Sequence, residues 1–250
     1  MPQRTRFGQP GSGARLCLAG EFQLLIDGAY MPVPHGVQRL LAYLGMTGRP
    51  VARSRVAGEL WQDVTEGRAL GNLRSSLWRL RRIPRPLVQM LDDSLALDAD
   101  VAIDLLDFEA FSNNLRRQPR EAILADLQEL TAAAELLPGW EDEWLVVERE
   151  RFHELRLHAL EGACAALIEA GDYSDAVQAA LAAIDGEPYR ESAQRLLITA
   201  YLHEGNAAAG LRAYDHYRKL IADEMGIVPS EAMERLLAGV RRLPGAGRSH

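Results

Sequence analysis

Long apolar runs are missing from this sequence of 250 residues. The longest, such as Leu196 to Leu202, fall far short of the roughly 20 residues that a bilayer requires, which excludes a membrane span. The start carries positive charge but lacks the apolar core of a secretory signal. Residues 1–14 are therefore expected to form a disordered arm, and residues 244–250 a disordered tail. The overall composition, with 48% apolar and 25% charged residues, is typical of a folded globular protein.

Cysteine is scarce, and the residue patterns of common enzyme sites are missing. Cys17 and Cys164 match no metal-binding or redox spacing, so two buried thiols in a reducing cytoplasm are predicted. No glycine-rich phosphate-binding loop follows a strand. His153 and His158 are five positions apart rather than four, so they do not share one face of a zinc-binding helix. We expect no catalytic residue, no cofactor and no metal.

Lysine is nearly absent, with Lys219 as the single one, and positive charge is carried by arginine. The net charge is −7, but it is unevenly distributed. Residues 1–100 carry 13 Arg against 9 acidic residues, a balance of +4, whereas the remaining 150 residues carry 15 basic and 26 acidic groups, a balance of −11. Nine arginines fall within residues 49–85. Such asymmetry indicates a basic functional surface in the N-terminal part.

The N-terminal part mixes strand and helix patterns. Alternating residues predict strands at 15–19, 21–26 and 29–33, with a hairpin turn at Asp27-Gly28. Helical spacing follows at about 37–48, 53–61 and 68–82. The segments 87–91 and 94–98, separated by Asp92-Asp93, predict a β-hairpin. Two short helices, a longer helix and a hairpin form the order of a winged helix-turn-helix, which we place at residues 15–102.

After Asp100 the pattern is helical throughout, and we assign residues 103–243 to one helical domain. Helices are expected at about 106–117, 121–136, 141–169, 174–184, 191–203, 207–224 and 230–240. Gly171 and Gly205 are 34 residues apart, and each ends one helix and opens the next. This spacing is the tetratricopeptide period. The predicted fold is therefore mainly α: an α+β winged helix-turn-helix followed by an all-α, tetratricopeptide-like domain.

The helix predicted at 68–82 has two contrasting faces. Leu70, Leu73, Leu77 and Leu80 form an apolar stripe. The opposite arc holds polar and basic residues, with Arg74 and Arg81 on its flanks: Arg68, Gly71, Asn72, Ser75, Trp78, Arg79 and Arg82. Arginine suits guanine, asparagine suits adenine, and serine suits a base edge or a phosphate, so this arc fits the major groove. A solvated helix face with surplus arginine is the alternative interpretation.

Two further arginines begin the preceding helix. Arg53 and Arg55 could meet DNA phosphates through their charge combined with the helix N-terminus. Simple surface solvation explains them nearly as well.

Longer segments extend the pattern across residues 15–243. The first half contains VARSRVAGELW and LRSSLWRLRR; the second contains LLPGWEDEWLVVERERFHELRLHALE, AGDYSDAVQAALAAIDGEPYRESAQRLLITAYLHEGN and GLRAYDHYRKLIADEMGIVPS. With these segments the chain resembles the Streptomyces antibiotic regulatory proteins, in which an OmpR-like winged helix precedes a bacterial transcriptional activation domain.

The resemblance implies a cytoplasmic, nucleoid-associated transcriptional activator. It would bind double-stranded DNA at direct repeats near promoters, with a homodimer on DNA as one arrangement, and recruit RNA polymerase to a secondary-metabolite gene cluster. By the same resemblance Ser75 and Arg79 would face bases, while Arg74, Arg81 and Arg82 would support backbone or flanking contacts.

The resemblance also implies a polymerase contact at the loop of residues 62–67. Its Asp63 and Glu66 suit a basic protein surface better than phosphate, although a merely solvated turn is an equal alternative. One departure from the family concerns the hairpin, which reads DDSLALDAD and places acidic residues where phosphate would approach. This motivates a rival hypothesis, a helical-repeat adaptor that binds proteins and whose winged helix is degenerate.

Overall fold

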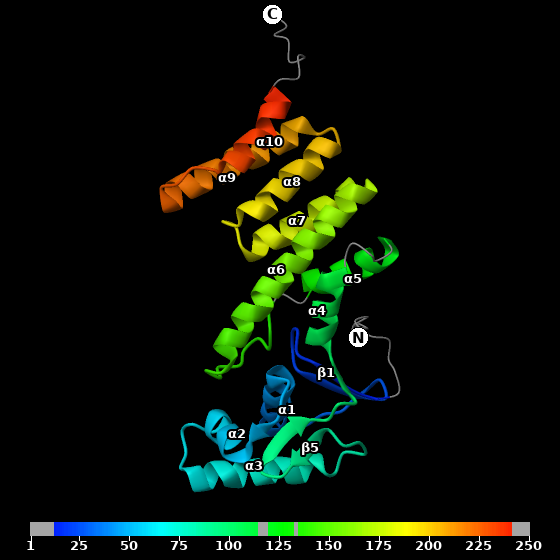
Figure 1. Ribbon diagram of the computed structural model, residues 1–250, viewed down its shortest axis with the longest axis vertical. Helices are drawn as coiled ribbons and strands as arrows, with labels where there is room; N and C mark the ends of the chain where they lie inside the picture. The colour runs from blue at the N-terminus through cyan, green and yellow to red at the C-terminus, as the bar shows by residue number, and fades with distance from the viewer. Residues whose placement is uncertain (1–12, 115–119, 133–134, 242–250) are drawn as a thin grey trace, which may run out of the picture. The chain divides into compact units, whose positions relative to one another are not determined.

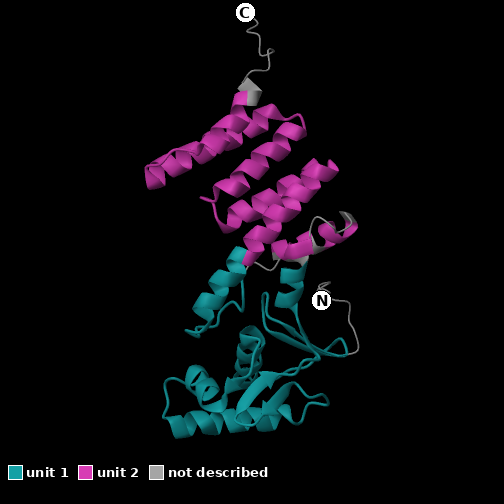
Figure 2. Cartoon of the chain, in the orientation of Figure 1, with its two compact units in different colours: residues 1–110, 132–154 teal, residues 111–131, 155–250 magenta. Residues whose placement is uncertain are grey.

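The computed structural model of this chain describes residues 13–114, 120–132 and 135–241. The chain divides into two compact units. The first unit comprises residues 1–110 and 132–154, and the second comprises residues 111–131 and 155–250 (Figure 2). Most of the predicted arm and all of the predicted tail lie outside the described residues. Ala14 was expected in the arm, but it is the first residue of a strand because it pairs with Ile26.

The first unit begins with a four-stranded sheet in the order β3-β2-β1-β7. Its strands are β1 (Ala14–Cys17), β2 (Gln23–Ile26), β3 (Ala29–Tyr30) and β7 (Val101–Ile103). The turn at Asp27-Gly28 is confirmed, with positive φ at both residues. The strand β7 corrects the expectation of helix directly after Asp100. It pairs in parallel with β1, and its Val101 and Ile103 are buried.

The rest of the winged helix follows the predicted order (Figure 1). It consists of α1 (His35–Thr47), β4 (Val51–Ala52), α2 (Arg53–Leu60), α3 (Glu66–Leu80), β5 (Val88–Leu91) and β6 (Ser94–Leu97). The β5–β6 hairpin is the wing, and β4 pairs with β6 to make a second, three-stranded sheet. Both α1 and α2 pack against α3, while α1 also contacts β6. The winged helix-turn-helix prediction is confirmed.

The chain leaves the first unit after residue 110, and residues 135–149 belong to that unit again. The backbone N–H of Gly20 donates to the carbonyl of Glu135 at 2.8 Å, and Leu136 bridges to the strand end at Ala19 and Gly20. The Arg149 guanidinium donates to three carbonyls of this segment, those of Leu136, Leu137 and Trp140. The first compact unit therefore extends beyond the boundary expected at residue 102.

Aromatic rings and an ion pair attach the same returning segment to α1. The Trp140 ring lies edge-on to His35 at 4.8 Å, and the Trp144 ring lies edge-on to Tyr43 at 5.3 Å. Arg39 forms a salt bridge with Asp142, and its Nε donates to Oδ1 at 2.7 Å. Trp140 and Trp144 are half-buried, and both act as packing residues against α1.

The second unit is helical. Its elements are the end of α4 (Asp104–Asn114), α5 (Arg120–Ala132), the later part of α6 (Leu145–Ala170), α7 (Tyr173–Gly186), α8 (Glu191–His203), α9 (Ala207–Met225) and α10 (Glu231–Arg241). Gly171 and Gly205 occupy the two turns of the 34-residue repeat at φ 83° and 84°, a backbone region that favours glycine. The tetratricopeptide-like prediction for this part is confirmed.

Polar side chains connect helices of this unit. The Arg156 side chain is buried, and its Nε donates to the carbonyl of Leu130 at 2.8 Å, which joins α6 to α5. Glu161 of α6 accepts from Arg190 at 2.8 Å and also from Ser192. The core around Ile198, Tyr217 and Met233 joins α8, α9 and α10.

Candidate nucleic-acid interface

The inner face of α3 attaches this helix to the core of the first unit. Leu73, Leu77 and Leu80 are buried, as the apolar stripe predicts. Leu70 is only partly buried, and Ser76 lies on the inner face instead. The helix is two residues longer at its start than expected, beginning at Glu66, and it ends at Leu80. Because the inner face is fixed, the orientation of the outer face is fixed as well.

The outer face of α3 is polar and strongly basic. Its predicted site residues are all exposed: Arg68, Asn72, Arg74, Ser75, Arg79, Arg81 and Arg82. Within the described part of the chain, none of these arginines forms an ion pair with a carboxylate. Their positive charges are therefore not neutralised by neighbouring groups, and the surface is suited to an anionic partner. The role of each residue stays a prediction.

The start of α2 lies beside the wing. The guanidinium groups of Arg53 and Arg81 lie 3.5 Å and 4.0 Å from the sulfur of Met90, so α2, the end of α3 and β5 meet at this point. Arg55 is exposed and lies 4.0 Å from the carboxylate of Glu59. The N-cap residue of α2 is Ala52, which offers no side-chain acceptor to the first turn. The structure thus brings Arg53 together with the α3 surface, which sequence spacing alone could not establish.

The wing tip consists of Asp92 and Asp93, both exposed. Asp92 adopts a positive φ of 50°, which closes the two-residue turn. The carbonyl of Asp93 accepts from the backbone N–H of Arg53 at 2.9 Å, so the turn is held against the start of α2. Two carboxylates at this tip disfavour a phosphate contact by the wing itself.

One feature of the outer face was not assigned a role from the sequence. The Trp78 side chain is 55% exposed, and the Arg82 guanidinium carbon lies 3.7 Å from the centroid of its ring. This distance is that of a cation–π contact. The spacing of four residues between them is the only sequence signal for it, and that signal is weak because Arg82 lies beyond the last helical residue.

The predicted polymerase-contact loop is shorter than expected. Asp63 lies in the turn between α2 and α3, but Glu66 is the first residue of α3 rather than part of the loop. A carboxylate at this position is favourable for the helix because it faces the positive end of the helix dipole. Both side chains are exposed.

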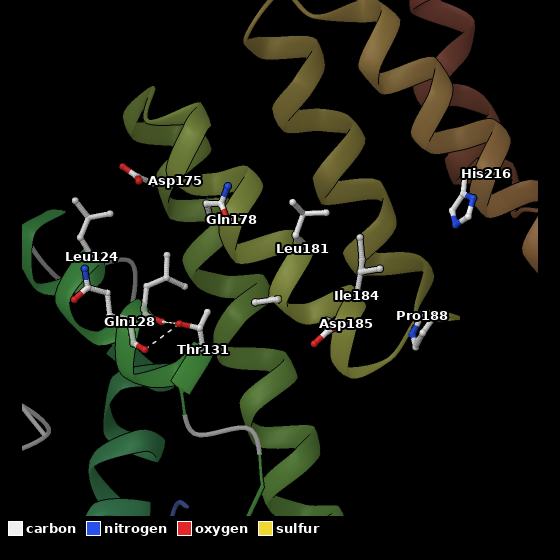
Figure 3. A pocket seen from close by; sticks show the side chains of 12 residues that line it. Leu124, Gln128, Thr131, Asp175, Gln178, Leu181, Ile184, Asp185, Pro188 and His216 are labelled. Atoms are coloured by element: carbon white, nitrogen blue, oxygen red, sulfur yellow. Dashed lines mark hydrogen bonds between the residues drawn. The ribbon is translucent and has the colours of Figure 1, made fainter. Parts of the chain in front are cut away.

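The second unit has a groove of about 930 Å³ between α5 and α7, shown in Figure 3. Its wall carries Leu124, Gln128 and Thr131 from α5, and Asp175, Gln178 and Leu181 from α7. Leu181 is 41% exposed. The lining mixes amide, hydroxyl, carboxylate, imidazole and alkyl groups, the imidazole being that of His216 on α9.

Both cysteines are buried, as expected from their spacing. Burial, together with the negative charge of Glu161, raises the pKa of the Cys164 thiol to about 12, so this group stays neutral at physiological pH. Within the described ranges no group of three or more His, Cys, Asp or Glu side chains could hold a metal ion. Every helix in those ranges is also too short or too polar to cross a bilayer.

This chain is similar to one protein-family model and to known regulatory proteins. The family model described as the bacterial transcriptional activator domain matches residues 103–241. The regulatory protein AfsR of Streptomyces coelicolor is 27% identical over 252 residues, covering 94% of this chain and 25% of AfsR. The transcriptional regulatory protein EmbR of Mycobacterium tuberculosis (strain ATCC 25618 / H37Rv) is 27% identical over 251 residues, covering 88% of this chain and 61% of EmbR.

A solved structure shares the fold. Mycobacterium tuberculosis EmbR in complex with a low affinity phosphopeptide superposes with a TM-score of 0.70 at 22% sequence identity, covering 92% of this chain and 65% of that chain. The chain thus spans a quarter of AfsR and about three fifths of EmbR. Winged helix and helical domain occur together in a chain of known structure.

Proposed function

Because this chain belongs to the bacterial transcriptional activator domain family, whose model matches residues 103–241, we propose that it is a transcriptional activator that binds duplex DNA through α3. The observation that carries the proposal is the exposed outer face of this helix. Five arginines lie on or beside it, and none forms an ion pair with a carboxylate of the described chain. An α-helix with such a face fits the major groove of B-DNA.

We assign different contacts to the centre and the margins of this surface. Ser75 and Arg79 are proposed to face base edges, because they lie away from the buried leucines. Arg68 and Asn72 adjoin them at the start of the helix. Arg74, Arg81 and Arg82 would meet backbone phosphates, and Arg53 and Arg55 would add phosphate contacts from the start of α2. The acidic wing tip is not assigned a DNA contact.

Selection of bound duplexes from a random DNA pool with the native chain tests the proposal. We expect one enriched sequence, arranged as a direct repeat if the protein binds as a homodimer. Its affinity should fall steeply as salt rises, because arginine–phosphate contacts release counterions. If the protein binds no selected duplex more tightly than a duplex of scrambled sequence, the DNA-binding proposal is wrong.

Replacing Arg79 with alanine should weaken binding to the selected duplex by about 1–3 kcal/mol, as for loss of a bidentate contact to a base. A gel-shift titration measures this change. Arg212→Ala is the matched control, since Arg212 is an exposed arginine on α9 of the second unit. Affinity that is unchanged in a folded Arg79→Ala protein would remove this residue from the reading surface.

Activation would require contact with RNA polymerase, and Asp63 and Glu66 are the proposed contact. Replacing both with alanine is expected to leave DNA affinity intact and to lower promoter-driven transcription in vitro, because two carboxylates suited to a basic surface are lost. The assay uses saturating DNA occupancy, verified by footprinting. If transcription persists at the wild-type level, the turn is only a connector, and activation depends on another surface.

The biological setting is proposed on the resemblance to Streptomyces antibiotic regulators. The protein would act in the cytoplasm on the nucleoid, at promoters of a secondary-metabolite gene cluster. The rival function is a helical-repeat adaptor that binds proteins, and the α5–α7 groove of the second unit favours it (Figure 3). The random-pool selection separates the two, because an adaptor with a degenerate winged helix would enrich no duplex.

A further inference from the structure

Trp78 is an unusual side chain for the outer face of α3. At about 100° per residue it lies only about 60° around the helix from Ser75, opposite the buried leucines. It is 55% exposed, whereas the other assigned residues of this face are polar or charged. An indole ring presents a large apolar area, and leaving that area in water is unfavourable unless a partner covers it.

The stacked Arg82 explains how the ring is held but not what it contacts. The guanidinium lies over one face of the indole at 3.7 Å from the centroid. This contact restricts the rotamers of both side chains and keeps the ring on the outer surface of α3. More than half of the side chain stays accessible in spite of it. A held and exposed apolar ring is therefore available to a partner.

The charge around the ring narrows the choice of partner to a polyanion. Arg74, Arg79 and Arg81 lie within four positions of Trp78 in the sequence, and all three are exposed with no ion pair to a described carboxylate. In the major groove of DNA the base edges present hydrogen-bonding groups, and the thymine C5-methyl is the apolar group among them. An exposed apolar side chain between arginines matches that group.

We infer that Trp78 contacts the C5-methyl group of a thymine in the major groove and so selects thymine at one position of the binding site. The inference rests on the proposed function, because α3 must enter the groove for the contact to form. It adds a residue to the specificity-determining set, beyond the hydrogen-bonding residues assigned above. Arg82, held against the ring, keeps the phosphate contact proposed for it above.

Removing single methyl groups from the DNA tests the inference. Each thymine of the duplex selected by the native protein is replaced in turn by deoxyuridine, which lacks only the methyl. We expect one position at which the native protein loses about fourfold in affinity, the effect of removing one buried methyl group. In Trp78→Ala the same replacement should have no effect. Trp78→Phe should keep part of the dependence, because it retains an apolar ring.

The outcomes separate this inference from the proposed function. If no duplex is selected, DNA binding itself fails and the inference fails with it. If a duplex is selected but Trp78→Ala keeps the native response to deoxyuridine at every thymine, the inference alone is overturned. It is also overturned if Trp78→Ala lowers transcription with DNA affinity unchanged, since the ring would then contact a protein. Tyr189→Ala, at an exposed aromatic residue of the second unit, controls for loss of an exposed ring.

Discussion

Replacing Leu77 with alanine is expected to lower the free energy of unfolding of the first unit by about 2–5 kcal/mol, the usual cost of a cavity at a buried leucine. Leu77 lies on the inner face of α3 and is 7% exposed. It is one of the residues that hold the helix in a single orientation against α1 and α2. Loss of its side chain removes apolar contact that the surrounding backbone cannot fully restore.

Chemical denaturation followed by tryptophan fluorescence measures this change. The chain has four tryptophans, Trp61, Trp78, Trp140 and Trp144, and all lie in the first unit, so the signal reports that unit. Arg74→Ala is the matched control three positions away on the exposed side, and it should change stability by no more than about 0.5 kcal/mol. Equal effects of the two substitutions would mean that the buried and exposed faces of α3 have been exchanged.

Asp104 should make the first unit more stable as pH falls from about 6 to about 4. Its Oδ2 accepts the backbone N–H groups of Leu18 and Ala19 at 2.8 Å and 3.0 Å. Its Oδ1 is buried and has no hydrogen-bond partner among the described residues. Burial raises the pKa of this carboxyl to about 6, although the two N–H donors and Arg15 act in the opposite direction.

The direction of this change in stability follows from comparing the native and the unfolded state of the chain. Well below pH 3.8 the group is protonated in both, and well above pH 6 it is ionised in both, which costs the native state about 3 kcal/mol relative to the unfolded chain. Asp104→Asn keeps a carbonyl oxygen for the backbone donors and removes the titration. The stability of the native protein relative to this variant should therefore rise by roughly 2–3 kcal/mol between pH 7 and pH 4. A difference that stays constant over that range would contradict the argument.

Sequence patterns predicted the parts of the fold that depend on local periodicity. The apolar positions of α3, the Asp27-Gly28 turn and the glycines at 171 and 205 each depend on residues close in the chain. The strand β7 escaped prediction because it is three residues long and pairs with β1, more than 80 residues earlier. In the candidate site, too, features set by neighbouring residues could be predicted, and features set by distant contacts could not. The exposed arginines of α3 were visible in the sequence, whereas the Arg53–Met90–Arg81 cluster depends on how the wing folds back.

The return of residues 135–149 to the first unit has a consequence for how such regulators can evolve. Trp140, Asp142 and Trp144 are encoded after the winged helix. Their side chains nevertheless contact α1 of the winged helix. A recombination event that joined a different winged helix at residue 102 would separate His35, Arg39 and Tyr43 from Trp140, Asp142 and Trp144, the side chains that they contact here. The winged helix and residues 135–149 should therefore be inherited together, and exchange of the winged helix alone should lower stability.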